Sequence, residues 1–404
     1  MSFYSQFVNV RYLEPESHNP SNRTEFKLPN NIYAYPNLRI VNLGLKGAVG
    51  SLSKIGCVAL IKHLYLYSDR ELIDSLRFAN QYHSFNQLIT SNSENRSIHA
   101  VLEKSQIGYV INNNKQVSAK NIRSAVGVAE DLINGSGGYL EVPKLLKILQ
   151  AEGFILDTAK MPNLRLVIEW ETEKKKYLST GTNNDFTVQK PTLIYDEIDN
   201  QELGQALSNQ MSNFTFPSIE HDAFNMATLN PQNNAPPAGH VQSVDARLKG
   251  FDNKFVNRFI LFKNFANIGM VDGAGNTIRG KGFYRSPVQH HEKIQCKVNG
   301  SPIFDDLIDN ESTKQYLTAD AWGSLNLMPY EGQLSAGLDN PQDGNHNFFG
   351  IPQDRENVIG MGSYFGFRVE DKVQDLEFHM QRQKVNDNTG ATPGAKVQVY
   401  NGSS

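Results

Sequence analysis

Hydrophobic and polar residues alternate over short segments along most of this chain, a pattern typical of half-buried β-strands. The clearest alternation lies at 163–171, where an apolar set (Leu164, Leu166, Ile168, Trp170) interleaves with a second set (Arg165, Val167, Glu169, Glu171). Because successive side chains of a strand point to opposite faces, the apolar set is predicted to face a core and the second set to face outward. Clusters of Gly, Pro, Asn and Ser separate such segments, which favours a sandwich or barrel of short strands.

The same pattern predicts strands throughout the chain. They are 24–28, 37–43, 57–67, 70–76, 97–103, 106–111 and 163–171 in the first half, and 255–264, 283–289, 292–298, 323–328, 363–370 and 375–382 in the second, followed by a weak strand at 396–400. In 375–382, Leu376, Phe378 and Met380 are predicted to share one face, opposite Glu377, His379 and Gln381. Short helices are predicted at 78–90, 143–151 and 199–211, and Pro143 suits a first helical turn.

A strand–turn–strand segment occurs twice. Residues 56–77 form a predicted hairpin with a polar turn at Ser68-Asp69-Arg70, and residues 292–310 form a looser copy. Both segments contain Leu-Ile-Asp after the turn. Two similar hairpins, one in each half, indicate a β-rich module that is used twice.

The 404 residues exceed the roughly 250–300 that one hydrophobic core usually serves, so two domains are expected. A polar stretch at 172–190, which contains Lys174, Lys175 and Lys176, is the predicted boundary, and 230–240 is a predicted exposed loop. The predicted parts are therefore an N-terminal arm (1–23), a first β-domain (24–190), a second (191–384) and a mobile C-terminal tail (385–404). The arm is predicted to be disordered or to order against a neighbouring subunit.

Composition narrows the function classes. The net charge is −3, so no excess of Lys and Arg favours binding to a nucleic-acid backbone. Both cysteines, Cys57 and Cys296, fall in predicted strands and are expected to be buried thiols, without CxxC spacing for zinc. No secretory signal pattern and no apolar run long enough to span a membrane are present. The Asn-x-Ser/Thr triplets at Asn22, Asn95, Asn213 and Asn299 are interpreted as chance matches.

Two segments could carry chemistry on residue type alone. Gly275–Gly282 matches G-x-x-x-x-G-K but has Gly282 where a phosphate-binding loop needs Ser or Thr, and Pro287 follows within strand-like sequence. A Gly-rich hairpin loop is the favoured interpretation. Glu169 and Glu171 would lie about 6.6 Å apart on one strand face, near the separation of an inverting glycosidase. A solvated strand end followed by three lysines is the favoured interpretation of that pair.

The remaining candidates lack partners. His290 and His291 would point to opposite faces of a strand, and neither His63 nor the pair His221-Asp222 has a recognisable partner in the sequence. Residues 339–347 are rich in oxygen ligands but miss the spacing and closing Glu of a calcium loop. No G-x-S-x-G motif is present. The sequence therefore predicts no enzyme, and no catalytic, cofactor-binding or metal-binding residues.

The hairpin at 56–76, the segment VPKLLKILQAEGFILD (142–157) and the strand NLRLVIEWE together carry a resemblance. They resemble the first half of the double jelly-roll major capsid proteins of the adenovirus, virophage and Polinton-like virus lineage. In that family an Ile/Val-Pro-Leu-type segment precedes the last strands of the first jelly roll, which Val142-Pro143-Lys144-Leu145 would match. KVNGSPIFDDL (297–307), SYFGFRVE and LEFHMQR are similar to the second half. The resemblance covers roughly residues 24–384, apart from 191–255, which does not align.

The resemblance implies an all-β fold of two tandem eight-stranded antiparallel jelly rolls with short helices in the loops. It implies a structural major capsid protein that forms pseudo-hexagonal homotrimeric capsomers and tiles an icosahedral virion shell, assembled inside the host cell. The implied partners are neighbouring capsomers and penton and minor or cement capsid proteins, without sequence-specific nucleic-acid binding or a transmembrane segment.

Two alternatives remain open from the sequence. The first is a jelly-roll glycan-binding adhesin or receptor-binding virion protein, whose site would use Tyr330, Asp339, Asp343 and His346. The second is a glycosidase that depends on Glu169 and Glu171 alone.

Overall fold

The chain divides into two compact units. The computed structural model describes residues 8–46, 51–52, 56–90, 102–103, 137–172, 178–180, 187–211, 216–226, 241–265, 292–309, 311–322, 365–383 and 395–401. Unit 1 comprises residues 1–84, 97–106 and 119–219, and unit 2 comprises residues 85–96, 107–118 and 220–404.

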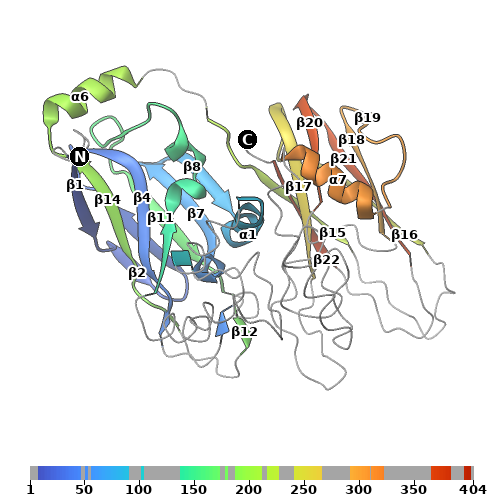
Figure 1. Cartoon of the computed structure of the whole chain (residues 1–404), viewed down its shortest axis with the longest axis horizontal. Helices are drawn as coiled ribbons and strands as arrows, with labels where there is room; N and C mark the ends of the chain where they lie inside the picture. The colour runs from blue at the N-terminus through green and yellow to red at the C-terminus, as the bar shows by residue number, and fades with distance from the viewer. Residues whose placement is uncertain are drawn as a thin grey trace, which may run out of the picture. The chain divides into compact units, whose positions relative to one another are not determined.

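Unit 1 contains two antiparallel five-stranded sheets (Figure 1). The β4 sheet has the order β1 (Val8–Leu13), β14 (Thr192–Ile198), β4 (Tyr33–Leu43), β10 (Leu156–Asp157), and β9 (Gly138–Glu141) also pairs with β4. The β7 sheet has the order β2 (Ser17–Asn19), β3 (Arg23–Lys27), β11 (Arg165–Trp170), β7 (Ile61–Ser68), β8 (Glu71–Arg77). Two small two-stranded sheets add β5 (Leu45–Lys46) with β13 (Thr187–Val188), and β6 (Ser51–Leu52) with β12 (Leu178–Thr180).

Unit 2 contains two antiparallel four-stranded sheets. The β17 sheet has the order β15 (His221–Met226), β22 (Ala395–Asn401), β17 (Lys254–Phe265), β20 (Phe365–Val373). The β18 sheet has the order β16 (Val241–Leu248), β21 (Leu376–Gln383), β18 (Glu292–Val298), β19 (Ser301–Pro302). In both units the last strand (β14 or β22) returns to lie between the first strand (β1 or β15) and a long strand (β4 or β17), which is the strand order of a jelly roll.

The repeated hairpins occupy equivalent places. β7–β8 in unit 1 and β18–β19 in unit 2 each form the edge of a sheet. In each, the turn donates a backbone N–H to the turn that precedes the next strand inward: Asp69 to the Pro162 carbonyl at 2.8 Å, and Asn299 to the Asp375 carbonyl at 2.9 Å. Asn299 and Gly300 both have positive φ, as an Asn-Gly type I′ hairpin turn requires. The predicted duplication of a β-module is therefore present in the structure.

Short and long connections lie at opposite ends of each unit, because consecutive strands alternate in direction. The tight turns 69–70 and 299–300 are hydrogen-bonded to the turns at 158–164 and 374–375, so these lie at one end of their units. The connection after β8 begins at the opposite end of unit 1, where Arg77 pairs with His63, and the connection after β19 runs along β18 as far as the bridge between Ile308 and Ile294. Helices α1 (Ala79–Thr90) and α7 (Glu311–Ala321) begin these two connections, a second sign of duplication.

Both cores contain the residues that the alternation predicted. Leu164, Leu166, Ile168 and Trp170 in unit 1, and Leu376, Phe378 and Met380 in unit 2, are all at most 2% exposed. Val167 was predicted to face outward, but it is also 2% exposed. It lies between Glu25 and Tyr65 on the neighbouring strands, whose longer side chains flank it on the outer face of the sheet.

The all-β fold class and most predicted elements are confirmed, with local differences. The helices predicted at 78–90 and 199–211 are α1 and α6 (Gln201–Gln210), whereas 143–151 forms two short 3-10 helices, η4 (Val142–Lys144) and η5 (Lys147–Gln150). Residues 56–60 form a 3-10 helix, η2 (Gly56–Leu60), before β7 rather than the start of a strand. Leu102 and Glu103 lie in a helical turn, where the strand 97–103 was predicted. The predicted strands 106–111, 283–289 and 323–328 lie outside the described residues.

The predicted boundaries of the arm, the two β-domains and the tail differ more from the structure than the predicted strands do. β1 and β2, within the predicted arm, pair with β14 and β3, so residues 8–19 belong to the sheets of unit 1. β14 pairs with β1 and β4, so the predicted boundary after residue 190 falls inside unit 1, which extends to Ile219. The weak strand predicted at 396–400 is β22 (Ala395–Asn401), but it lies in the interior of a sheet and not in a mobile tail. The last strand of each jelly roll pairs with the first strand of the same jelly roll. This pairing cannot be predicted from local composition, because the two strands are far apart in the sequence.

Helix α6 is fixed to the β4 sheet by a close approach at Gly204. Asn200 caps its N-terminus by accepting a hydrogen bond from the Leu203 N–H at 3.0 Å, and buried Ser208 donates to Asp157 at 2.5 Å. A Cβ at Gly204 would lie 2.3 Å from Cδ2 of Tyr33. The absence of a side chain therefore permits this contact.

Gly204→Ala is expected to destabilise unit 1 by about 1–3 kcal/mol, because the added methyl group must displace α6 or the ring of Tyr33. Urea denaturation followed by circular dichroism measures the change. Gln205→Ala, on an exposed position of the same helix, is the matched control and is expected to change stability by less than about 0.5 kcal/mol. Equal stability of the two variants would contradict the packing described.

Candidate functional site

The outer face of the β4 sheet exposes apolar side chains at one edge. Val10 and Tyr12 on β1 are 52% and 72% exposed, and they lie opposite Asp196 and Ile194 on β14. Tyr35 on β4 lies opposite Asp196 and is half-buried. We call Val10, Tyr12, Tyr35 and Ile194 the β1 patch. Large apolar side chains that remain exposed together on a sheet edge are typical of a surface that contacts another protein.

Ion pairs border the β1 patch. The Arg11 guanidinium binds Glu197 at 2.6 Å, and Arg39 binds Asp196. Hydrogen bonding and charge attraction from Glu197 raise the pKa of Arg11. Each pair joins one positive and one negative side chain, so the residues around the apolar patch have no net charge.

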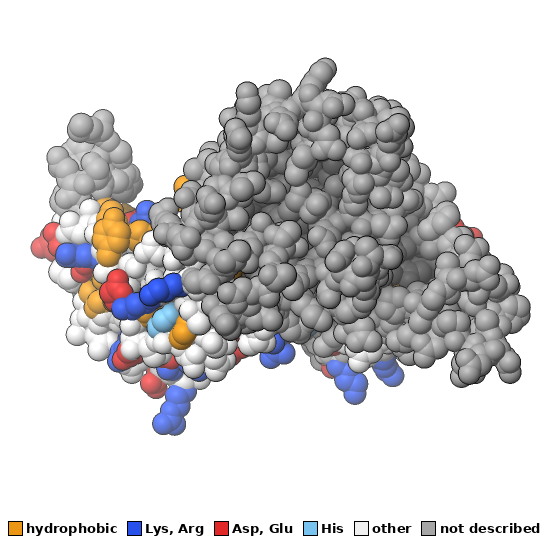
Figure 2. All heavy atoms as spheres, turned by 90° about the horizontal axis from the view of Figure 1, so that it is seen from below, with side chains coloured by type: hydrophobic (Ala, Val, Ile, Leu, Met, Phe, Trp, Pro, Cys, Tyr) orange, Lys and Arg blue, Asp and Glu red, His pale blue; other side chains and the backbone are white. Residues whose placement is uncertain are grey.

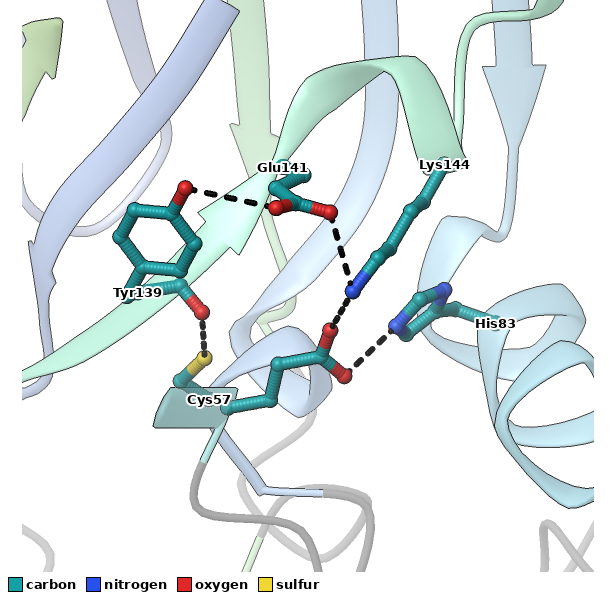
Figure 3. Close-up of polar contacts among 6 residues, drawn as sticks. Cys57, His83, Tyr139, Glu141 and Lys144 are labelled. Carbon is teal, nitrogen blue, oxygen red and sulfur yellow. Dashed lines mark hydrogen bonds and ion pairs between the residues drawn. The ribbon is translucent and has the colours of Figure 1, made fainter. Parts of the chain in front are cut away.

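Unit 1 also contains a buried polar cluster, at the point where η4 follows β9 (Figure 3). The ammonium of Lys144 binds buried Glu103 at 2.8 Å and Glu141 at 3.2 Å, and His83 Nε2 contacts the other Glu103 oxygen at 3.1 Å. His83 and Glu103 are each 1% exposed. Tyr139 adds a long contact to Glu141 at 3.5 Å, and its carbonyl accepts from Cys57 Sγ at 3.9 Å.

The cluster is arranged as a structural clamp. Burial opposes the charge of Lys144, but the attraction of Glu103 and Glu141 outweighs it and raises the pKa of the ammonium. The clamp joins three segments that are distant in sequence: α1, the helical turn at 102–103, and η4. His83 Nδ1 is buried without a hydrogen-bond partner among the described residues. No sequence signal marked this set, because residues 83, 103 and 144 share no spacing.

Lys144→Met is expected to destabilise unit 1 by about 3 kcal/mol, because it removes the cation that compensates a buried carboxylate. Since the folded pKa of Lys144 is raised, its contribution is fully present below the unfolded value of 10.5 and is lost as the pH rises through the folded value. Urea denaturation at pH 7 and at increasing alkaline pH measures both effects. Lys46→Met, at an exposed lysine of the same unit, is the control; a similar loss in both variants would contradict the clamp.

The structure separates the two glutamates predicted to share an outward face. A β-bulge lies between Glu169 and Trp170 and shifts the register against β7. Glu171 is consequently 4% exposed and accepts a hydrogen bond from the Asn80 amide at 3.2 Å, whereas Glu169 remains half-buried on the outer face. The predicted solvated pair is therefore wrong for Glu171. The pair also lacks the shared cleft that a glycosidase needs.

The other sequence candidates have structural partners or lie outside the described residues. His63 Nδ1 accepts the backbone N–H of Phe78 at 3.0 Å. The ring of His221 packs on Tyr400 at 4.8 Å, and Asp222 accepts the backbone N–H groups of Lys249 and Gly250. The candidates 275–282, 290–291 and 339–347, and Tyr330, lie outside the described residues.

The described residues hold no group of three or more potential ligands that could bind a metal ion. Cys57 and Cys296 are both 0% exposed, as predicted, and burial raises the pKa of the Cys296 thiol. Within the described part of the chain, no helix is long and apolar enough to cross a membrane.

Unit 2 has a concave outer surface on the β18 sheet, with a volume of about 430 Å³. Its polar lining consists of Asp245, Arg247, Gln295, Lys297, Glu377 and His379. His379 Nδ1 contacts Asp245 at 2.5 Å, and Arg247 binds Asp375 at 2.6 Å. The lining contains two acidic side chains (Asp245, Glu377) and two basic ones (Arg247, Lys297), so their charges cancel. The concavity could therefore hold a polar group that is uncharged or zwitterionic.

No protein-family model matches the chain, and no curated protein sequence is significantly similar to it. Solved structures do match. VP54 of PBCV-1, fitted into a reconstruction of the virophage Sputnik, covers 98% of this chain with 93% of its own length, at 10% identity and a TM-score of 0.54. The mavirus major capsid protein covers 99% with 88% of its length, at 12% identity and a TM-score of 0.53.

A third match, to the quasi-atomic model of the PBCV-1 virus capsid, has 10% identity and a TM-score of 0.52, and covers 98% of this chain and 93% of that one. The similarity extends over nearly the whole length of each chain and includes both units. Together with the strand order, it shows that this chain has the double jelly-roll fold of these proteins.

Proposed function

We propose that this chain is a structural protein of a virion: a major capsid protein whose copies tile an icosahedral shell. The observation that carries the proposal is the presence of two tandem jelly rolls with equivalent strand orders, matched end to end by viral capsid proteins. At 10–12% identity this likeness concerns the fold, so the role itself stands as a proposal. The protein would be located in the virion, after assembly inside the host cell.

The proposed assembly is a homotrimer. Two similar units in one chain give six jelly rolls in three copies, which suits a pseudo-hexagonal capsomer. The proposed partners are neighbouring capsomers and penton and minor or cement capsid proteins. Obligate interfaces of this kind commonly bury about 2,000 Å² or more.

The described surface is compatible with packing against copies. The net charge of −3 is small for 404 residues, and Figure 2 shows Lys and Arg side chains interspersed with Asp and Glu and with hydrophobic side chains. Such a mixed surface lets identical molecules approach without strong mutual repulsion. The net charge also provides no excess of positive charge to attract the backbone of a nucleic acid.

Light scattering coupled to size-exclusion chromatography, followed by negative-stain imaging, tests the proposal. The expected mass is three times the 45.3 kDa of the chain, and the expected images are hexagonal particles or closed shells. A stable monomer at micromolar concentration and above would contradict the proposed function.

The proposed function is not enzymatic. Of the two glutamates considered for glycoside hydrolysis, Glu171 is buried against Asn80 and cannot reach a substrate on the outer face with Glu169. Glu169→Gln is therefore expected to leave the properties of the protein unchanged, including its oligomeric mass.

The concave surface of the β18 sheet favours a second candidate, a glycan-binding virion protein. Its acidic, basic and amide side chains could bind the hydroxyl groups of a saccharide by hydrogen bonds. A glycan array of the wild type and of Lys297→Ala tests it: binding that is lost in the variant would support it, and no binding would exclude it. Residues Tyr330, Asp339, Asp343 and His346, first considered for this role, lie outside the described residues.

A further inference from the structure

Strand β1 has one edge that no described strand covers. β1 ends the β4 sheet and pairs only with β14 among the described strands. In an antiparallel sheet, every second residue of an edge strand directs its N–H and C=O away from the neighbouring strand. No backbone hydrogen bond within the described part of the chain fills this side of Val8–Leu13. The edge therefore carries a row of donors and acceptors that another strand can complete.

β1 also lacks the features that normally protect an edge. It contains no proline or lysine, and its one charged side chain, Arg11, is bound to Glu197. Val10 and Tyr12 are among the most exposed large hydrophobic residues described. The equivalent strand of unit 2, β15, exposes no large hydrophobic side chain among its described residues. Exposure of this kind is thus a property of β1 and not of the strand position in the fold.

We propose that β1 pairs with β1 of a second copy of the chain, antiparallel about a two-fold axis that passes through Val10. A two-fold axis perpendicular to the sheet makes two copies of one strand antiparallel. For backbone hydrogen bonds to form between the copies, each residue whose N–H and C=O point outward must lie opposite a residue of the second copy whose groups also point outward. Since these groups recur at every second residue, the axis must pass through a residue and not between two. The axis can therefore lie at any residue of Val8–Leu13, although an axis at Val8 or Leu13 would pair a single residue.

Charge and length select Val10. An axis through Arg11 would place two guanidinium groups directly opposite each other, which is destabilising. Axes through Val8, Asn9 or Tyr12 leave much of the strand unpaired. With the axis at Val10, Tyr12 faces Val8 of the second copy and Arg11 faces Asn9. Val8, Val10 and Tyr12 then each have an apolar partner, the one charge faces an amide, and only Leu13 lies beyond the paired residues.

The paired edges would join two β4 sheets into one continuous sheet across the two copies. This inference deepens the proposed function, because it names one contact between copies, and it rests on the proposed self-assembly. The contact has two-fold symmetry and is therefore separate from the three-fold contacts within a trimer. It would link one trimer to the next.

Cysteine cross-linking of the full-length protein tests the register. In the Val10→Cys variant, Cys at position 10 of one copy lies directly opposite the same residue of the second copy. Their Cα atoms would be about 4.5–5.5 Å apart, as in other antiparallel pairs, and a disulfide can span this distance. We expect a disulfide-linked dimer under mild oxidation. The native Cys57 and Cys296 are 0% exposed, so the wild type gives the background.

Tyr12→Cys is the matched control, because Tyr12 lies on the same strand face and is more exposed than Val10 (72% against 52%). Two copies of residue 12 would be four positions apart along the strand, about 13 Å, which is too far for a disulfide. Tyr12→Cys alone is expected to stay uncross-linked, whereas a mixture of Val8→Cys and Tyr12→Cys is expected to form a mixed dimer. Cross-linking of Tyr12→Cys as strong as that of Val10→Cys would overturn the proposed register.

Val10→Lys separates this inference from the proposed function. A charge at the axis faces its own copy and blocks edge pairing without altering the core. We expect the variant to retain the trimer mass but to lose association between trimers. If it forms shells as the wild type does, the edge pairing is wrong and the proposed function stands. A wild type that remains monomeric would instead overturn the proposed function.

Discussion

Trp170→Ala is expected to lower the free energy of unfolding of unit 1 by about 3–5 kcal/mol. The indole is 2% exposed in the centre of the unit, and its Nε1–H donates a hydrogen bond to Thr24 Oγ1 at 3.0 Å. Truncation leaves a large cavity and removes a donor from a hydroxyl group that is itself fully buried. Thermal unfolding monitored by circular dichroism measures the change.

Trp170→Phe is the graded control. It retains most of the apolar volume and loses the hydrogen bond, so we expect a smaller loss than for alanine. If both variants were as stable as the wild type, Trp170 would not occupy the core described here.

Phe367→Ala is expected to destabilise unit 2 by about 3–5 kcal/mol. The ring of Phe367 is 1% exposed and lies 5.2–5.9 Å, between ring centroids, from Phe304, Phe365 and Phe259. Aromatic contacts of this geometry stabilise the fold beyond the contribution of the buried apolar area. A neighbouring ring could fill the cavity left by alanine only by losing its contacts with other rings. Urea denaturation measures the change.

Phe255→Ala is the matched control, since Phe255 belongs to the same unit and is 66% exposed. Surface substitutions of this kind usually change stability by less than about 0.5 kcal/mol. Equal effects of the two phenylalanine substitutions would show that unit 2 does not unfold around the core assigned to it.

The strands and their buried faces were predictable where the evidence is local. Leu376, Phe378 and Met380 alternate with polar residues, and period-two alternation arises directly from the geometry of a strand. The duplicated hairpin was visible because its turn and both its strands fall within about 20 residues. These features predicted a β-rich module that is used twice, and the resemblance to double jelly-roll capsid proteins implied the jelly-roll topology.

The closing strands were not predictable in the same way. β14 was not predicted, and β22 was predicted only as a weak strand in a mobile tail, because polar neighbours dilute the hydrophobic signal of both segments. Each strand forms its sheet by pairing with strands 130 or more residues away along the chain. Pairing at such a separation leaves no periodic trace near the strand itself. The boundary after 190 and the tail after 384 were therefore placed one strand too early.

The candidate sites show the same limit. The bulge that buries Glu171 inserts an irregularity that alternation alone cannot anticipate. The clamp of His83, Glu103 and Lys144 depends on three segments meeting in space. The alternation in β1 was present in the sequence, but Pro15, Pro20 and the polar residues around it favoured an arm.

The separation of tight turns from long connections has a consequence for how such a chain can change. Asn299, in the turn between β18 and β19, accepts the N–H groups of Gln374 and Asp375 and donates to the Lys372 carbonyl, so an added residue there would break several bonds at once. Doubling a long connection costs only about 0.6 kcal/mol in closure entropy. A foreign peptide for display is therefore tolerated better in a long connection than in this turn, at a site outside α1, the turn at 102–103 and α7, all of which contribute buried side chains.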